Sequence, residues 1–422
     1  MGYTKDLWTR PEKSAEGKTK RVRNGRWGKG KRWLACWTNT DGKEESKAFR
    51  TRTAADKHWQ GKETDKERGE YIDSKAGDAL FATFGKRWLG SRIVDPSSVI
   101  QYESKYRLHV EPTFGKRKVS RIKPSDVQQW LRNLSERFEV STVLASFLVL
   151  QGALELAVAD GAIKTNPARS KAVQVPKRSP KEVEAWSDER VFAVIDAHPE
   201  RYRLVPILGA GCGLREGEIF GLAEEDIDFD EKVIRVRRQL KKVNGTFIFS
   251  LPKNDRERIV PLPDWVAGAI HDHVKVHPPR PYSLPWEKTT GKAHTCKLLL
   301  RWRTDDLHIR ARNFSETVWK PAIVKAEVIP APEKVKDEKP GKDGKRKTRV
   351  RYATSRKEGT HQLRHFYASV TLAEGVSIKE LAEYLGHHDP GFTLRTYAHM
   401  LPCSHERARK AIDNRMQLRL AA

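Results

Sequence analysis

The sequence of 422 residues contains only four cysteines, Cys36, Cys212, Cys296 and Cys403, and none lies near another. Zinc half-sites and disulfide frameworks need paired cysteines, so we expect neither, and we expect a reduced, cytoplasmic protein. No apolar run approaches the roughly 18 residues of a membrane-spanning helix, and no signal peptide opens the chain. These absences disfavour a secreted or integral membrane protein.

Two patterns of cofactor-dependent enzymes are missing as well. The chain has no GxxxxGK[ST] phosphate-binding loop, and it has no group of Asp and Glu at metal-ligand spacing. We therefore expect no cofactor, no metal and no use of ATP.

The chain instead carries a large excess of positive charge. Lys and Arg number 81 against 55 Asp and Glu, which gives a net charge of +26. Such an excess favours a polyanionic partner, either nucleic acid or an anionic membrane surface. The 12 Trp, 14 Phe and 10 Tyr are enough for real cores, so uniform disorder is unlikely and two or three domains are expected.

The N-terminal region, residues 1–66, is predicted to be a basic arm followed by a small β-plus-helix module. Residues 1–32 carry 11 Lys and Arg against 3 Asp and Glu, which we interpret as a mobile arm. An aromatic strand at 32–37, a turn at Asp41-Gly42, a returning strand at 48–50 and a charged helix at 53–68 follow. Five of the 12 Trp lie in the first 60 residues, where they build a small core or stack on bases.

The remaining chain divides into three segments. Apolar residues recur at helical spacing within 76–167, which predicts an all-helical domain. Residues 168–185 are lysine-rich with two prolines and are predicted to be a linker. The segment 186–422 is predicted to be mainly helical with a small sheet, from strands at 233–236, 247–249 and 259–260. It contains a basic insert at 325–360, interpreted as a surface loop, and a basic tail helix at 404–420. The fold class is thus mainly α with small β-sheets.

The C-terminal part holds the most informative motifs. His361 and Arg364 are three residues apart and share one face of a predicted helix. Ser377-x-x-Glu380 is a capping box for the next helix, and Gly386 is its expected C′ residue. His387 follows Gly386 at once, so its imidazole lies at a helix end. Tyr397 lies near the end of a further short helix.

Two motifs lie upstream of these histidines. Arg215 sits in a glycine-rich turn that enters a helix, where glycine allows a backbone to approach a phosphate closely. Lys253 lies in the turn between two predicted strands and is placed to project a cation into a groove. Each motif alone is most often structural, but the ordered set is hard to obtain by chance.

The ordered set resembles the tyrosine recombinase (phage integrase) family over most of 76–410. The specific matches are GLREGEI at 213–219, PKN at 252–254, HQLRHFYAS at 361–369 and LGHHDPGFTLRTYAH at 385–399. The resemblance implies a mainly α fold with an α+β catalytic domain. It also implies a site-specific DNA recombinase that forms a 3′-phosphotyrosyl intermediate.

The resemblance also implies a role for each matched residue. Arg215 and Arg364 would hold the non-bridging oxygens of the scissile phosphodiester, with Glu218 supporting them from behind. Lys253 would protonate the leaving 5′-oxygen, and His361 would assist proton transfer at the nucleophile. His387 would hydrogen-bond the phosphate, and Tyr397 would attack phosphorus. Nine residues separate His387 from Tyr397 where many members have eight, so His388 is the alternative to His387. Tyr384 is the close rival of Tyr397.

This chemistry is consistent with the residue types. Charge builds up on the equatorial oxygens during attack on a phosphodiester, and guanidinium groups bind such oxygens in a bidentate way. Two arginines and a histidine can thus replace a metal ion. A covalent intermediate keeps the energy of the broken bond, so rejoining needs no ATP.

The implied partners are duplex DNA at a crossover site, arm-type DNA sites for residues 1–66, and three further copies of the chain in a tetramer. In that family the helical domain and the catalytic domain close around DNA as a clamp. A directionality or bending protein is a further expected partner. A type IB-like topoisomerase, a chromosome-dimer resolvase and a non-enzymatic DNA-binding protein are the alternatives; the three-module layout favours an integrase.

Overall fold

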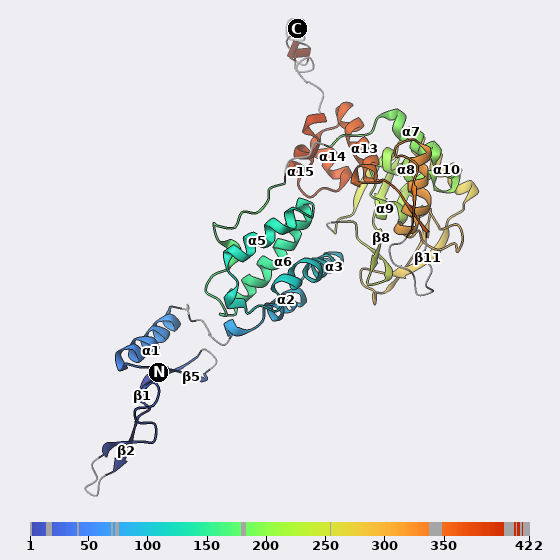
Figure 1. The fold of residues 1–422 in the computed structure, drawn as a ribbon. Helices are drawn as coiled ribbons and strands as arrows, with labels where there is room; N and C mark the ends of the chain where they lie inside the picture. Colours follow the sequence, from blue (N-terminus) through green and yellow to red (C-terminus); the bar gives the residue numbers. More distant parts are fainter. Residues whose placement is uncertain are drawn as a thin grey trace. The chain divides into compact units, whose positions relative to one another are not determined.

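The computed structural model describes residues 2–13, 19–39, 42–68, 71, 76–178, 183–253, 255–336, 348–400, 409–410, 412–413 and 416. The chain divides into two compact units, Met1–Ser179 and Pro180–Ala422 (Figure 1). Helices predominate and the sheets have two or three strands, so the predicted fold class is confirmed.

The first unit begins with five strands and a helix. These are β1 (Tyr3–Asp6), β2 (Thr9–Lys13), β3 (Thr19–Arg23), β4 (Trp33–Thr38), β5 (Glu44–Phe49) and α1 (Arg52–Glu67). Helical segments follow: η1 (Ala76–Asp78), α2 (Phe81–Gly90), α3 (Pro96–Lys105), η2 (Tyr106–Val110), α4 (Glu111–Phe114), η3 (Val119–Arg121), α5 (Pro124–Ser135), α6 (Val140–Ala159) and η4 (Pro167–Arg169).

The predicted mobile arm at residues 1–32 is wrong for the described residues. Strand β1 pairs antiparallel with β4 in a sheet of order β1-β4-β5, and β2 pairs with β3. Helix α1 starts at the N-cap Thr51 and packs on this sheet. The Trp37 indole donates a hydrogen bond of 3.0 Å to the Tyr71 hydroxyl, which in turn donates to Glu45. The module therefore includes Tyr71, five residues beyond its predicted end. Arm prediction failed because charge composition does not reveal strand pairing.

Helix α6 is the centre of the helical part of the first unit. By length and composition alone it could cross a membrane, so the expectation that no such segment exists is corrected. Eight of its side chains are buried, and α2, α3 and α5 pack around it. Its apolar character is that of a helix enclosed on several faces by its own domain.

The second unit has strands β6 (Ile227–Asp228), β7 (Val233–Val236), β8 (Gln239–Val243), β9 (Thr246–Ser250), β10 (Arg258–Pro261), β11 (Arg280–Pro285), β12 (Ala293–Leu298), β13 (Glu333–Lys336) and β14 (Thr348–Arg351). Its helical segments are α7 (Asp188–Ala197), α8 (Glu200–Cys212), α9 (Glu216–Phe220), η5 (Glu224–Asp226), α10 (Asp264–Val276), α11 (Ala311–Phe314), η6 (Ser315–Trp319), α12 (Lys320–Lys325), η7 (Arg356–Glu358), α13 (His361–Ala373), α14 (Ile378–Leu385), α15 (Pro390–Tyr397) and η8 (Ala398–Met400).

Helix α8 lies in the core of the second unit and packs against α7, α10 and α13 (Figure 1). The three strands predicted for one sheet are present but divide between two. Strand β10 pairs with β7 and β7 with β6, whereas β9 pairs with β8 across the turn at Asn244-Gly245. Strands β11 and β12 form a hairpin that the sequence did not predict.

The basic insert at 325–360 is more structured than the predicted surface loop. Strands β13 and β14 pair antiparallel, with Lys334 opposite Val350, and the residues between them lie outside the described part of the chain. Most of the predicted tail helix at 404–420 also lies outside the described residues. Residues 409–410, 412–413 and 416 are helical.

Candidate active site

Arg364 lies at the centre of the candidate site, in the first turn of α13. Its side chain is 1% exposed and donates to the carbonyl oxygens of Gly213, at 2.6 Å, and of Leu385. These carbonyls close the C-terminal ends of α8 and α14, where the helix dipole places partial negative charge. Burial, and then the charges of Arg215 and Arg258, lower the pKa of Arg364 to about 9, so it stays cationic at neutral pH.

Arg215 is held beside Arg364 by Glu218. The chain leaves α8 through Gly213, whose φ of 61° is left-handed, and a Cβ there would lie 2.5 Å from the Tyr367 ring. Glycine is therefore required here by the left-handed turn and by the packing against Tyr367. These two reasons explain the glycine without the expected approach of the backbone to a phosphate. The Arg215 guanidinium donates to Glu218 Oε1 at 2.9 Å, and its backbone N–H donates to Oε2 at 2.8 Å. The Arg215 side chain remains 19% exposed.

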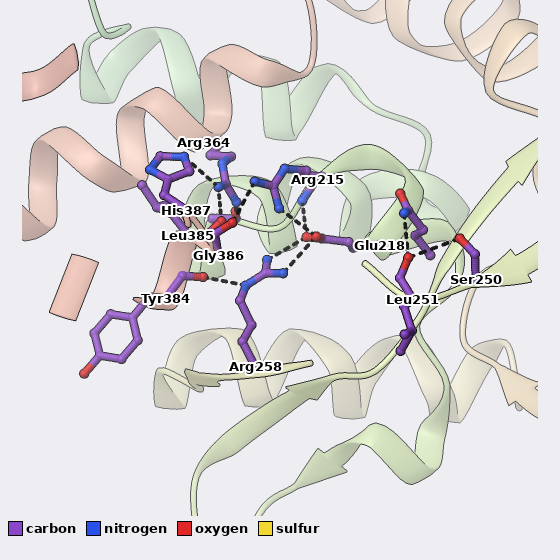
Figure 2. Close-up of polar contacts among 12 residues, drawn as sticks. Arg215, Glu218, Ser250, Leu251, Arg258, Arg364, Tyr384, Leu385, Gly386 and His387 are labelled. Carbon is purple, nitrogen blue, oxygen red and sulfur yellow. Dashed lines mark hydrogen bonds and ion pairs between the residues drawn. The ribbon is translucent and has the colours of Figure 1, made fainter. Parts of the chain in front are cut away.

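Glu218 also binds a second arginine, Arg258 of β10. Figure 2 shows the carboxylate between the two guanidinium groups. Arg258 donates to Oε1 at 2.8 Å and to Oε2 at 2.6 Å, and its Nε donates to the Tyr384 carbonyl at 2.7 Å. Burial alone would raise the pKa of Glu218, but the hydrogen bonds and charges of Arg258 and Arg215 lower it to about 2. Glu218 is thus an anion that fixes both arginines.

His387 lies against Arg364. Gly386, with a φ of 60°, ends α14, and the His387 backbone N–H closes the turn on the Ala382 carbonyl. His387 Nε2 is 3.2 Å from an Arg364 nitrogen, and Nδ1 is 2.7 Å from the Thr393 hydroxyl. A guanidinium only donates, so Nε2 accepts and the proton of the neutral ring is on Nδ1. Burial and then the Arg364 charge lower the pKa of His387 to about 3.

The alternative histidine, His388, is exposed, and the structure brings His387 rather than His388 to the arginines.

Tyr397 is buried in a small apolar cluster, with 2% of its surface exposed. Its hydroxyl is 2.8 Å from Nδ1 of His365, which the sequence did not single out. Burial raises the pKa of Tyr397 to about 12, although the charges of Arg364 and Arg215 act to lower it. The rival Tyr384 is only half-buried, and its carbonyl, rather than its hydroxyl, faces Arg258.

His361 and Lys253 lie at the edge of this group. The His361 ring is 4.7 Å from the His365 ring, and His361 is exposed. Desolvation by the surrounding protein, and then the charges of Arg364, Arg215 and Lys253, lower the pKa of His361 to about 4. Lys253 is exposed in the loop between β9 and β10 and makes no hydrogen bond or ion pair with another described residue. The structure therefore brings together Arg215, Glu218, Arg364 and His387, and the charges of both arginines act on Tyr397 and His361. Lys253 acts on His361 through its charge alone among the described contacts.

Known proteins match this chain in sequence and in fold. A family model described as "Phage integrase, N-terminal SAM-like domain" matches residues 80–135. A XerC-like tyrosine recombinase of Caldanaerobacter subterraneus is 27% identical over 73% of this chain and 75% of its own length. The putative prophage phiRv2 integrase of Mycobacterium tuberculosis is 26% identical over 58% of this chain and 67% of its own length.

The predicted resemblance to the tyrosine recombinase (phage integrase) family is confirmed.

Solved structures resemble this chain in fold. The Tn1549 transposon integrase, solved with transposon right-end DNA, has a TM-score of 0.62 at 19% identity and covers 82% of this chain and 100% of its own. A lambda integrase dimer bound to a core site has a TM-score of 0.51 at 16% identity and covers 85% and 91%.

Two polar residues of the candidate site were missed by sequence reasoning. His365 had a usable signal, because it lies four residues after His361 on the same helix face. Arg258 had no such signal, because a single arginine in a strand gives no indication of a partner 40 residues away.

Among the described residues, no group of three or more His, Cys, Asp or Glu is placed to hold a metal ion. The metal-free reaction remains a prediction.

Proposed function

We propose that this chain is a site-specific DNA recombinase of the integrase type, which cleaves and rejoins duplex DNA through a covalent 3′-phosphotyrosyl bond. One observation carries the proposal: a buried tyrosine hydroxyl is hydrogen-bonded to His365, and the charges of Arg364, which contacts His387, and of Arg215 act on it. The names of the matched proteins, among them phage and prophage integrases and the transposase of transposon Tn916, support it.

The two arginines would bind the scissile phosphate. The attack places negative charge on the non-bridging oxygens, and fixed guanidinium groups stabilise that charge without reorganising. Arg215 is the more accessible of the two, because its side chain is 19% exposed, and Glu218 accepts a hydrogen bond from its guanidinium. Arg364 is buried, and its Nε has no hydrogen-bond partner among the described residues, so one donor is left for an anion. His387 would add a further contact to the phosphate.

Lys253 would be the general acid for the leaving 5′-oxygen. Its side chain is exposed, and its charge acts on His361. An exposed lysine needs no internal partner before DNA binds, because the phosphate itself supplies the opposite charge. Tyr397 would keep the bond energy in the phosphotyrosyl linkage, so that rejoining proceeds without ATP or metal.

The other modules would bind DNA outside the reaction centre. The helical domain, 76–167, contains the match to the integrase N-terminal family and is proposed as the core-binding domain. In the N-terminal module Arg23 lies 4.1 Å over the Trp27 ring, and Arg32 lies 4.7 Å over Trp33. Arginines stacked on partly exposed indoles suit phosphate and base contacts, which supports an arm-type site.

The assembled state is also a proposal. One matched lambda integrase structure is a tetramer bound to a Holliday junction, with a TM-score of 0.51. We propose that this chain likewise acts as a tetramer on two paired DNA sites, inside the cell, together with a directionality or bending protein.

A denaturing gel tests the reaction. A pool of nicked duplexes with randomised sequence is incubated with the full chain, and DNA that stays covalently attached is sequenced to define a site. We expect a covalent adduct with the wild type and none with Tyr397→Phe, which should still bind the selected duplex. Tyr384→Phe is the matched control and should form the adduct normally. Adduct formation by Tyr397→Phe would exclude Tyr397 as the nucleophile.

A further inference from the structure

The hydroxyl of Tyr397 makes a hydrogen bond to a residue that has no assigned role. His365 lies one helical turn after His361 on α13, and its Nδ1 is 2.8 Å from Tyr397 Oη. The two rings lie 5.7 Å apart at an interplanar angle of 58°. Among the described residues this is the one hydrogen bond of the phenol, so His365 contacts the atom that would attack phosphorus.

The charge states fix the direction of this hydrogen bond. The raised pKa of Tyr397, about 12, keeps the phenol protonated at neutral pH. Burial and then the charges of His361 and Arg364 lower the pKa of His365 to about 4, so the imidazole is neutral. The phenol therefore donates and Nδ1 accepts, which leaves the ring proton on Nε2. A neutral imidazole that accepts from a hydroxyl nucleophile is the arrangement of a general base.

We propose that His365 is the general base that takes the Tyr397 phenol proton during strand cleavage and returns it during rejoining. This inference rests on the proposed function. In cleavage the Tyr397 oxygen forms a bond to phosphorus, the bond from phosphorus to the 5′-oxygen breaks, and the phenol proton moves to Nδ1. The leaving 5′-oxygen receives its proton from the general acid. Rejoining reverses each step, and the imidazolium reprotonates the departing phenol.

His361, which the family resemblance implies for proton transfer at the nucleophile, is less well placed for it. Its ring contacts the His365 ring, and no hydrogen bond joins it to the phenol among the described contacts. Its exposed position suits contact with the phosphate or with water. His365 instead lies between His361 and Tyr397.

The surroundings of His365 allow it to exchange a proton with solvent. It lines a cavity of about 520 Å³ next to α7 and the segment before α13. The titratable and charged groups that face it are, on its own helix, His361 and Arg364, on α15 Tyr397, and around the cavity Glu184, Arg190, Lys357 and Glu358. Two of the cavity groups are carboxylates, so an imidazolium formed there is not surrounded by cations alone. The bound phosphodiester would add negative charge and raise the pKa of His365 as DNA docks.

Two substitutions separate a base from a structural contact. His365→Ala removes both the hydrogen bond and the proton acceptor. In His365→Asn the amide oxygen can still accept from the phenol but cannot take its proton. We expect both variants to bind the selected duplex and to cleave it about 10²–10⁴-fold more slowly than the wild type. His271→Ala, which removes an exposed histidine on α10, is the matched control and should cleave at the wild-type rate.

Two further readouts identify the proton that is affected. Imidazole added to His365→Ala should restore part of the rate, because the truncated site opens to the cavity. A duplex with sulfur in place of the bridging 5′-oxygen has a leaving group that needs no acid, so it should rescue Lys253→Ala but not His365→Ala.

Each outcome decides between the alternatives. Wild-type rates in His365→Ala, full activity in His365→Asn, or rescue of His365→Ala by the sulfur-bridged duplex would each overturn the role of His365. A wild-type chain that forms no covalent adduct would instead overturn the proposed function, and this inference with it. Circular dichroism and duplex binding of His365→Asn show whether a slow variant is folded, and slow cleavage by that folded variant would support the inference.

Discussion

Replacement of Arg258 by methionine is expected to lower the free energy of unfolding of the unit Pro180–Ala422 by about 3 kcal/mol. The reason is that the buried carboxylate of Glu218 loses its main partner. The Glu218 side chain has no exposed surface, and the Arg258 side chain is 7% exposed. Removal of one partner of a buried ion pair typically costs about 3–5 kcal/mol. The depression of the Glu218 pKa from 4.5 to about 2 corresponds to a similar figure, about 3 kcal/mol at neutral pH. Arg215 still binds Glu218 in the variant, so the lower end of the range is expected.

The loss should depend on pH in a defined direction. The folded pKa of Glu218 lies below its unfolded value, so this carboxylate stabilises the fold above pH 4.5 and loses that effect as pH falls toward 2. In Arg258→Met, burial still raises the pKa of Glu218, and chiefly Arg215 remains to lower it. The Glu218 pKa is therefore higher than in the wild type, and the stability that the carboxylate contributes is lost at a higher pH. The difference between wild type and variant should therefore be largest near pH 7 and shrink below pH 4.

Hydrogen exchange of peptides from α13 measures the free energy of opening of this unit in the intact chain. The control is Arg235→Met on the neighbouring strand β7, whose 3.2 Å ion pair with Asp228 is 37% and 31% exposed. An exposed pair of this kind should contribute about 0–1 kcal/mol. Equal destabilisation by Arg258→Met and Arg235→Met, or a loss that grows toward acid pH, would refute the reasoning.

Three further predictions concern the reaction and the modules. Arg215→Ala should lower the rate of strand cleavage by about 10²–10³ while duplex affinity falls much less, as measured by adduct formation and by a binding titration; equal losses would indicate a mere positioning contact. Cleavage and strand exchange should proceed in EDTA without nucleotide, and an absolute need for Mg²⁺ in the cleavage step would contradict this. Deletion of residues 1–66 should leave crossover-site cleavage intact and remove the footprint on a second DNA site. Deletion through Tyr71 should give the same result and also removes a residue that packs on the deleted module. An unchanged footprint on a long attachment-site DNA would contradict an arm-type domain.

The sequence predicted well those elements whose signals are local. Ser187 and Ser377 cap α7 and α14 as expected, and Gly386 adopts the left-handed conformation expected of a C′ residue. A cap involves hydrogen bonds between residues three or four apart, so a short stretch of sequence carries all the information. The order from Arg215 to Tyr397 likewise led to the family, because the spacing of matched motifs is itself a property of the sequence.

Strand pairing needed the tertiary structure. Strands were predicted at the positions of β7, β9 and β10, but which of them pair depends on contacts between distant segments. For the same reason, residues 1–32 were predicted to be an arm, although they contain the three strands β1, β2 and β3. A strand's residues show that it is half-buried, and they do not show which strand lies next to it.

The site shows the same division between local and distant information. The sequence by itself determined which side chains are available: two arginines in matched motifs, a glutamate three residues after the first, and a tyrosine after Leu-Gly-His. Only the fold decided that Arg258 shares the carboxylate of Glu218, that the Gly213 carbonyl binds Arg364 from 151 residues away, and that His365 rather than His361 holds the Tyr397 hydroxyl. The physical reason is that a buried charge or hydroxyl must find partners at hydrogen-bond distance, and the packing of α8, α13 and α14 with β10 determines which groups come within that distance.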